Sequence, residues 1–252
     1  MISLQDKVVI ITGGGRGIGF GLSTAFAKAG AKLVITGRTE STLVAAKEKL
    51  EQLGTEVLCV TADGADEAAI QNVIDKTVEK FGRIDAVVNN AQASASGKML
   101  VQHTKEDLDL AIYSGIYATF FYMQKAYPYL KETKGCVINF ASGAGLFGRI
   151  AQSSYAAAKE GIRGLSRVAA TEWAPDGVRV NVICPLAMTE GLQKFKEEYP
   201  ERYEQTIKGV PMGRFADPEK DVGGMCVFLC SDEASYVTGE TITLQGGSGL
   251  RP

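Results

Sequence analysis

Histidine is almost absent from this 252-residue sequence, which contains only His103. A histidine-based zinc site or a Ser–His–Asp hydrolase would depend on that one residue, which lies in a predicted exposed loop. The five cysteines include no Cys-x-x-Cys pair, and Cys226 and Cys230 lie in an apolar helical run where thiols serve as small core residues. These shortages argue against zinc chemistry and a disulfide framework, and they favour a reducing, cytoplasmic compartment.

Charge of one sign and long apolar runs are also lacking. The formal net charge is −2, and the 27 basic and 29 acidic residues are mixed along the chain. The apolar runs, such as 8–11, have the length of a strand rather than the roughly 20 residues that span a bilayer. No secretory signal precedes the first of them. We therefore expect neither nucleic acid nor a membrane as a partner.

What the sequence does contain is a regular alternation of apolar strands and helix-period segments. The strand starts recur about every 25 to 30 residues in the first half, which is the size of a βαβ unit. Strands are predicted at 7–11, 32–36, 57–61, 86–88, 136–140, 178–183 and 241–244. Helices are predicted at 17–29, 40–53, 67–81, 105–130, 154–173, 190–207 and 219–229. This order predicts a doubly wound α/β Rossmann fold, in which helices cover both faces of a parallel sheet of about seven strands.

No linker or low-complexity tract divides the chain, so the sequence predicts one domain over residues 1–252. The segment near 190–210 follows the sixth predicted strand and is amphipathic. We expect it to act as a lid over a substrate.

A glycine-rich loop joins the first strand to the first helix. Five of the seven residues in 13–19 are glycines, and such a loop lets the backbone approach a pyrophosphate at a helix N-terminus. After the second strand comes Arg38, with no acidic residue before Glu40, and Arg16 adds a second cation inside the loop. A guanidinium binds the 2′-phosphate of NADP(H), which a carboxylate would repel. The loop therefore predicts an NADP(H) site.

Tyr155 and Lys159 lie four residues apart in a predicted helix, which places both on one face. An ammonium near a phenol favours the phenolate and lowers the pKa of the phenol, so the pair can transfer protons near neutral pH. Ser142 follows the strand at 136–140, where a hydroxyl can hydrogen-bond a substrate oxygen. These three residues are the candidate catalytic group.

Together these motifs resemble the short-chain dehydrogenase/reductase family over nearly the whole chain. The resemblance implies that Lys159 also holds the nicotinamide ribose, beside Tyr155. It implies cofactor contacts for Gly13, Arg16, Gly17, Ile18, Gly19, Arg38, Asp63, Asn90, Ala91 and Thr189. It also implies a homotetramer.

Three positions depart from the family pattern. Gln92 follows Asn90 and Ala91 where the family usually has Gly, and Leu186 stands where a Gly usually follows Pro185. Gly115 aligns by eye with an Asn that helps hold a water beside the catalytic Lys. We expect the helix to be distorted at Gly115, so that its backbone carbonyls hold that water instead.

The segments around these departures are similar to bacterial 12α-hydroxysteroid dehydrogenases, which oxidise bile acids with NADP. The resemblance implies a steroid or bile-acid substrate. An apolar cleft suits a rigid sterol, and the candidate substrate residues are Gln92, Leu146, Phe147, Leu186, Met188 and Phe195. Another hydroxysteroid dehydrogenase or a 3-ketoacyl-thioester reductase remains an alternative within the same chemistry. A non-catalytic NADP-binding protein is a more distant one.

Overall fold

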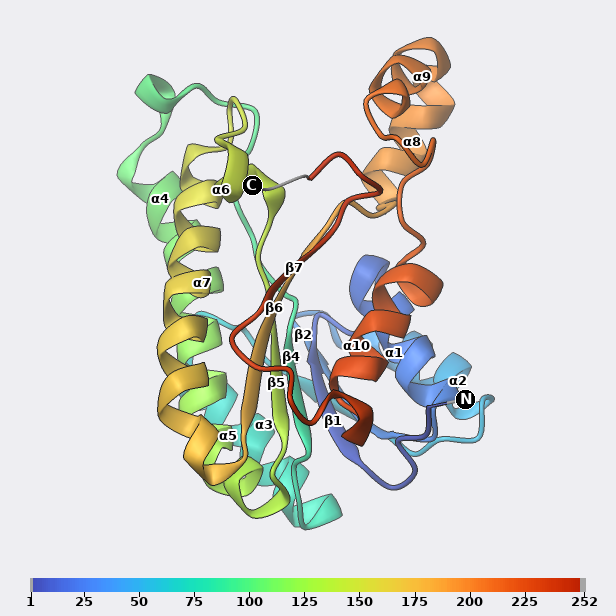
Figure 1. Cartoon of the computed structure of the whole chain (residues 1–252), viewed down its shortest axis with the longest axis vertical. Helices are drawn as coiled ribbons and strands as arrows, with labels where there is room; N and C mark the ends of the chain where they lie inside the picture. The colour runs from blue at the N-terminus through green and yellow to red at the C-terminus, as the bar shows by residue number, and fades with distance from the viewer. Residues whose placement is uncertain (1, 250–252) are drawn as a thin grey trace.

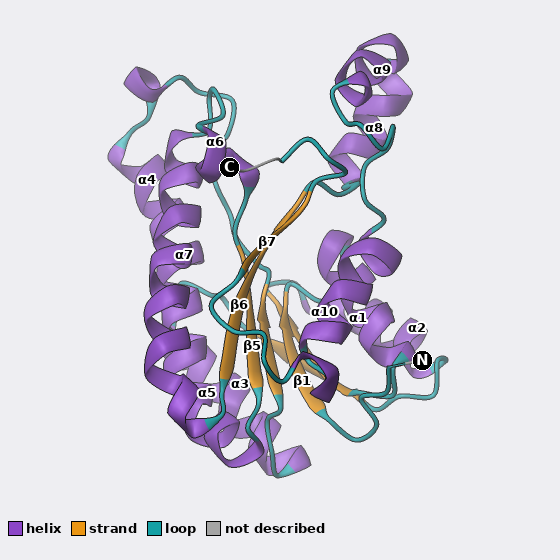
Figure 2. Cartoon of the chain, in the orientation of Figure 1, coloured by secondary structure: helices purple, strands orange, loops and turns teal. Residues whose placement is uncertain are grey.

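A computed structural model of the chain describes residues 2–249. Seven parallel strands form one sheet in the order β3-β2-β1-β4-β5-β6-β7, drawn in orange in Figure 2. The strands are β1 (Val8–Thr12), β2 (Lys32–Gly37), β3 (Val57–Thr61), β4 (Ala86–Asn89), β5 (Cys136–Phe140), β6 (Arg179–Pro185) and β7 (Thr241–Leu244). The predicted doubly wound parallel sheet is confirmed.

Helices cover both faces of the sheet, as Figure 1 shows. On one side lie α1 (Gly17–Lys28), α2 (Glu40–Glu51) and α10 (Gly224–Leu229). On the other lie α3 (Glu67–Phe81), α5 (Ala118–Thr133) and α7 (Ser153–Trp173). Successive side chains of a strand point to opposite faces, so Val9 and Ile11 pack in the core under α1, whereas Val8 and Ile10 pack under α3 and α5. Burial on both faces explains why the strands are continuous apolar runs.

The prediction of a single α-helix at 105–130 is wrong. It is divided into α4 (Lys105–Ala111), a π-helical segment η2 (Ile112–Tyr117) and α5. Short π-segments inside helices are local insertions that often occur at functional sites. Gly115 lies in the middle of η2, where we expected a distortion.

Two other helices also differ from the sequence prediction. The helix at 190–207 is broken into α8 (Glu190–Glu198) and α9 (Pro200–Lys208), because Pro200 lacks the N–H that would continue α8. The helix at 219–229 begins as a second π-segment, η4 (Pro218–Gly223), before α10. The sequence analysis missed four short elements: α6 (Gly143–Phe147), η1 (Leu100–Gln102), η3 (Ala174–Asp176) and η5 (Asp232–Ala234). Within residues 2–249, no helix combines the length and apolar character needed to cross a membrane.

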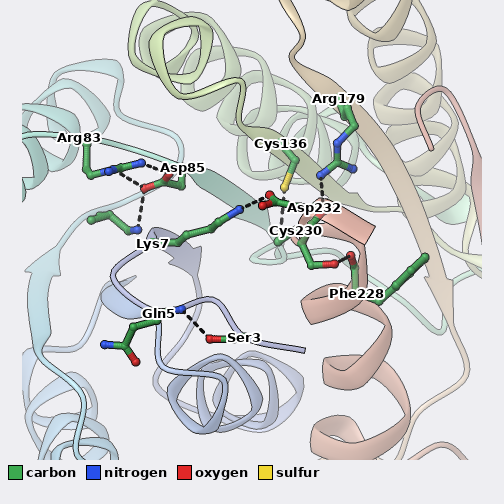
Figure 3. A network of polar contacts seen from close by, with 12 residues as sticks. Ser3, Gln5, Lys7, Arg83, Asp85, Cys136, Arg179, Phe228, Cys230 and Asp232 are labelled. Carbon is green, nitrogen blue, oxygen red and sulfur yellow. Dashed lines mark hydrogen bonds and ion pairs between the residues drawn. The ribbon is translucent and has the colours of Figure 1, made fainter. Parts of the chain in front are cut away.

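A polar network lies beside the amino ends of the central strands, as Figure 3 shows. Asp85 is 7% exposed, and its carboxylate accepts hydrogen bonds from the Val8 N–H at 2.9 Å and from Arg83 at 2.9 and 2.6 Å. Nearby, the thiol of Cys136 donates to the Sγ of Cys230 at 3.0 Å, and both residues are buried. Asp85 therefore connects β1 to the start of β4.

We predict that Asp85→Ala lowers the free energy of unfolding by about 2–4 kcal/mol, because it leaves the Val8 N–H unpaired inside the protein. Urea unfolding followed by circular dichroism measures this loss. Asp232→Ala is the control, since the Asp232 side chain is 92% exposed beside Lys7 and should matter by less than about 1 kcal/mol. Equal losses in the two variants would contradict the assignment of Asp85.

Candidate active site

The loops after β1 and β4 meet where the order of the strands reverses, since β1 pairs with β2 on one side and β4 on the other. Open α/β sheets bind ligands in the crevice at this point. Thr12 joins the loops, because its Oγ1 accepts from the N–H groups of Asn90 and Ala91 at 3.0 Å each. The Asn90 side chain in turn donates to the Thr12 carbonyl at 3.0 Å. These bonds hold Asn90 and Ala91 beside the glycine-rich loop.

The glycine-rich loop folds tightly against the first turn of α1. A Cβ added at Gly19 would lie 2.0 Å from the carbonyl oxygen of Gly13, so only glycine fits there. Arg16 precedes α1 in an extended conformation and forms no side-chain cap, so its side chain leaves the first N–H groups of the helix open to a ligand. Free N–H groups and the positive end of the helix dipole favour a phosphate. The loop therefore fits the pyrophosphate of a dinucleotide.

A cavity of about 890 Å³ extends from this loop along the carboxyl ends of the strands. Its lining brings together every residue for which the sequence analysis expected a cofactor contact, apart from Tyr155 and Lys159. These residues are Gly13, Arg16, Gly17, Ile18, Gly19, Arg38, Asp63, Asn90, Ala91 and Thr189. Arg38 and Arg16 are both exposed at the cavity. Gln92 also lines it.

The three candidate catalytic residues come from β5 and α7. Ser142 follows β5 and caps α6, because its Oγ accepts from the Ala144 N–H at 3.1 Å. Lys159 extends from α7 and donates to the carbonyl of Phe140, at the end of β5, at 2.6 Å. Its Nζ lies 5.4 Å from the centre of the Tyr155 ring. The Lys159 bond thus brings the Tyr155 helix against the strand that leads to Ser142.

Burial shifts both titrating groups of this trio. It raises the pKa of Tyr155, and a hydrogen bond with Ser142 opposes the rise. It lowers the pKa of Lys159 to about 7, because the ammonium is removed from water. Burial outweighs any effect of Lys159 on Tyr155 in the chain by itself. The two pKa values therefore move apart, and the expectation that Lys159 lowers the pKa of Tyr155 does not hold for the chain alone, because burial dominates both groups.

The candidate substrate residues are distributed over four segments of the chain, and of them only Gln92 lines the large cavity. Leu146 in α6 packs on Ala141, and its neighbour Phe147 is 51% exposed. Leu186 and Met188 follow β6, and Phe195 in α8 lies with its ring centre 5.7 Å from that of Tyr199. Their part in binding a substrate stays a prediction.

The sequence analysis missed several lining residues. Leu110, Tyr113 and Ser114 all face the cavity from α4 and η2. Their proximity to Gly115, which departs from the family pattern, was the available signal. Glu190 at the start of α8 also lines the cavity, so α8 begins at its edge.

A dinucleotide-binding crevice beside a Ser, Tyr and Lys group defines the class of nicotinamide-dependent oxidoreductases. Comparisons with known proteins agree. A family model described as enoyl-(acyl carrier protein) reductase matches residues 13–248. The chain belongs to the short-chain dehydrogenase/reductase family of oxidoreductases.

Two relatives in sequence and one solved structure show which proteins this chain is similar to. The 12α-hydroxysteroid dehydrogenase of Clostridium sp. (strain ATCC 29733) is 60% identical, and the alignment covers 98% of each chain. A 3-oxoacyl-[acyl-carrier-protein] reductase of Thermotoga maritima is 35% identical over 97% of this chain and 98% of its own. The structure of L-sorbose reductase from Gluconobacter frateurii, complexed with NADPH and L-sorbose, superimposes with a TM-score of 0.93 at 28% identity, covering 100% of this chain and 99% of the other.

The buried Lys159 leads to a prediction about stability. Its pKa falls from 10.5 to about 7 on folding, so the unfolded chain binds more protons than the folded one between those pH values. The free-energy cost of burying the Lys159 ammonium is largest below pH 7 and disappears as the pH rises towards 10.5. The free energy of unfolding of the native chain should therefore rise as the pH increases from 7 to 10.5. In Lys159→Met, which cannot titrate at this position, that rise should be smaller by about 3–5 kcal/mol.

Chemical denaturation at several pH values measures this difference. Lys76→Met on the exposed surface of α3 is the matched control for replacing a lysine with methionine. A difference for Lys159→Met that is constant with pH would show that Lys159 is not deprotonated on folding.

Proposed function

We propose that this chain reversibly oxidises the 12α-hydroxyl of bile acids to a 12-oxo group, with NADP as cofactor. The likeness to the Clostridium 12α-hydroxysteroid dehydrogenase, which extends over nearly the full length of both chains, is the observation that carries this proposal. The fit of the cavity to a dinucleotide and the grouping of Ser142, Tyr155 and Lys159 support it.

The chain's own residues perform the proton chemistry. The bound cofactor supplies the acceptor for the hydride that leaves C12. Tyr155, as phenolate, takes the proton of the substrate hydroxyl, and Ser142 donates a hydrogen bond to the same oxygen as its charge changes. Lys159 would hold the ribose, and its ammonium would favour the phenolate against the burial that raises the pKa of Tyr155 in the chain alone.

The choice of NADP over NAD rests on the arginines. Arg38 and Arg16 both line the cavity, one at the end of β2 and the other in the glycine-rich loop. Glu40 begins α2 and is exposed, and it is absent from the cavity lining. A 2′-phosphate would therefore meet two guanidinium groups.

A sterol would lie beside the apolar rim of the site. Phe147 and Ile150 are 51% and 78% exposed after Ser142, and Leu100 and Val101 are 73% and 92% exposed after β4. The Gly97 N–H donates to the Ala151 carbonyl at 2.9 Å, which joins these two loops, and a continuous apolar patch marks a binding site. The helices α8 and α9 stand away from the sheet (Figure 1, upper right), and α8 contains no buried residue. We propose that they close over the sterol as a lid within a one-domain enzyme.

We also propose a homotetramer located in the cytoplasm. Tyr117 and Phe120 on η2 and α5 are 42% and 38% exposed, and Val168 on α7 is 56% exposed. Aromatic residues on a helical surface suit an interface between copies. Reduced cysteines support the location, since none of the five, all within residues 2–249, is in a disulfide.

A 3-oxoacyl-thioester reductase is the second candidate function. The Thermotoga relative and the description of the family model favour it. Its chemistry uses the same groups in the reducing direction, so only the substrate separates the two functions.

We predict that the enzyme reduces NADP⁺ with cholic and deoxycholic acids, which carry the 12α-hydroxyl, and not with chenodeoxycholic acid, which lacks it. Absorbance of NADPH at 340 nm measures the rate. The same assay in reverse, with an acetoacetyl thioester, tests the second candidate. Turnover indifferent to the 12α-hydroxyl would refute the proposed specificity.

Tyr155→Phe is the catalytic control for this assay. It should lose nearly all turnover, because it lacks the phenolic proton acceptor, yet it should still bind NADPH in a fluorescence titration. Retention of turnover would remove Tyr155 from the mechanism, and absence of turnover in the native chain would favour a binding protein.

We predict that Arg38→Ala raises the KM for NADP⁺ about 10- to 100-fold and changes the KM for NAD⁺ much less. Loss of a charge-assisted contact with phosphate gives a change of this size. Steady-state kinetics with both cofactors measures it. Arg167→Ala on the exposed surface of α7 is the control and should leave both values unchanged. Equal effects on the two cofactors would contradict a 2′-phosphate contact.

A further inference from the structure

The side chain of Gln92 occupies the space above Gly115. A Cβ added at Gly115 would lie 2.9 Å from the Cδ of Gln92, 3.0 Å from its Nε2 and 3.1 Å from its Oε1. Three nearly equal distances mean that the carboxamide lies face-on over the glycine. Any larger residue at 115 would displace the carboxamide, so the residues at positions 92 and 115 depend on each other.

The carboxamide of Gln92 has unused hydrogen-bonding capacity. Its Nε2 and Oε1 are both buried, and neither has a hydrogen-bond partner within the described residues. Burial of an amide without a partner costs about 1–3 kcal/mol, so an orphaned amide inside a cavity calls for an explanation. Gln92 lines the cofactor cavity. Its amide is therefore available to the chemistry of that cavity.

The loop that carries Gln92 is bonded to η2. The Oγ of Ser114 accepts from the Ala93 N–H at 3.0 Å and lies 2.5 Å from the Leu110 carbonyl, where α4 changes into the π-segment. These contacts hold the residues after Gln92 against the turn that contains Gly115. The position of the carboxamide is thus set by the backbone of both segments.

The same π-segment packs on the catalytic helix. A Cβ added at Gly161 in α7 would lie 2.4 Å from the Cδ1 of Ile116, so Ile116 contacts α7 two residues beyond Lys159. Lys159 is 3% exposed. Oxidation of an alcohol releases one proton for each hydride transferred, so the proton accepted by Tyr155 has to leave the site, and Lys159 is the buried titrating group beside Tyr155.

We infer that Gln92 is a positioning residue for this proton transfer. Its carboxamide fills the space that a polar side chain at 115 would occupy, beside the π-segment that packs on α7, and supplies a donor and an acceptor for a proton that leaves by way of Lys159. This inference rests on the proposed dehydrogenase function. It explains Gln92 and Gly115 as one compensating exchange rather than two separate departures from the family pattern.

The test compares two single variants with their combination. Gln92→Met keeps the length of the side chain and removes the amide. It should keep or raise the melting temperature, because the unpartnered amide is removed, and should leave the KM for NADP⁺ unchanged. It should lower kcat at neutral pH about 10- to 100-fold and move the rise of kcat to higher pH. Gly115→Asn should also lose activity, because its Cβ would collide with Gln92. The double variant Gln92→Gly/Gly115→Asn should recover most of the native kcat and pH profile.

Native kcat and pH profile in Gln92→Met would overturn the inference, because the side chain would then act by shape alone. So would a double variant no more active than Gly115→Asn. Any alcohol that the native enzyme turns over serves for these comparisons, so failure of the bile-acid specificity is distinguished from failure of this inference. If Gln92→Met folds poorly, recovery in the double variant still decides.

Discussion

The hydrogen bond from the Lys159 ammonium to the Phe140 carbonyl is the contact on which the site depends. It is 2.6 Å long, and it lies almost wholly out of water. Through it, the helix that carries Tyr155 is joined to the strand that leads to Ser142. Burial of the Lys159 side chain also lowers its pKa to about 7, which places one titrating group of the site near neutral pH.

On the cofactor side, the site depends on the space that glycines leave because they have no side chain. Gly19 lets α1 begin against the carbonyl of Gly13, so that phosphate and helix terminus can meet. Gly115 leaves room over the π-segment, which the Gln92 carboxamide fills. In the first case the space lets the backbone approach a ligand, and in the second it accepts a polar group from another part of the chain. Both depend on the loops that Thr12 holds together.

Much of the fold could be predicted from the sequence, because strands buried on both faces are continuous apolar runs and because the glycine-rich loop has few other uses. The places where helices break were harder to predict. Pro200 was visible as a helix breaker, but the amphipathic pattern around it obscured the break. The π-segment at 112–117 contains no proline, so only the departure at Gly115 indicated a distortion. The candidate cofactor residues could be named because they directly follow strands, whereas the proposed substrate residues lie on separate helices and loops.

The amino-acid sequence alone determined the alternation of strands and helices, the phosphate loop and the four-residue spacing of Tyr155 and Lys159, because each is a local pattern along the chain. Only the tertiary structure decided that burial, rather than the neighbouring charge, dominates both pKa values. Only it placed Gln92 over Gly115 and left the amide without a partner. Burial and contact depend on segments that are far apart in the sequence and come together in the folded chain. A local sequence pattern does not show which distant segments will meet.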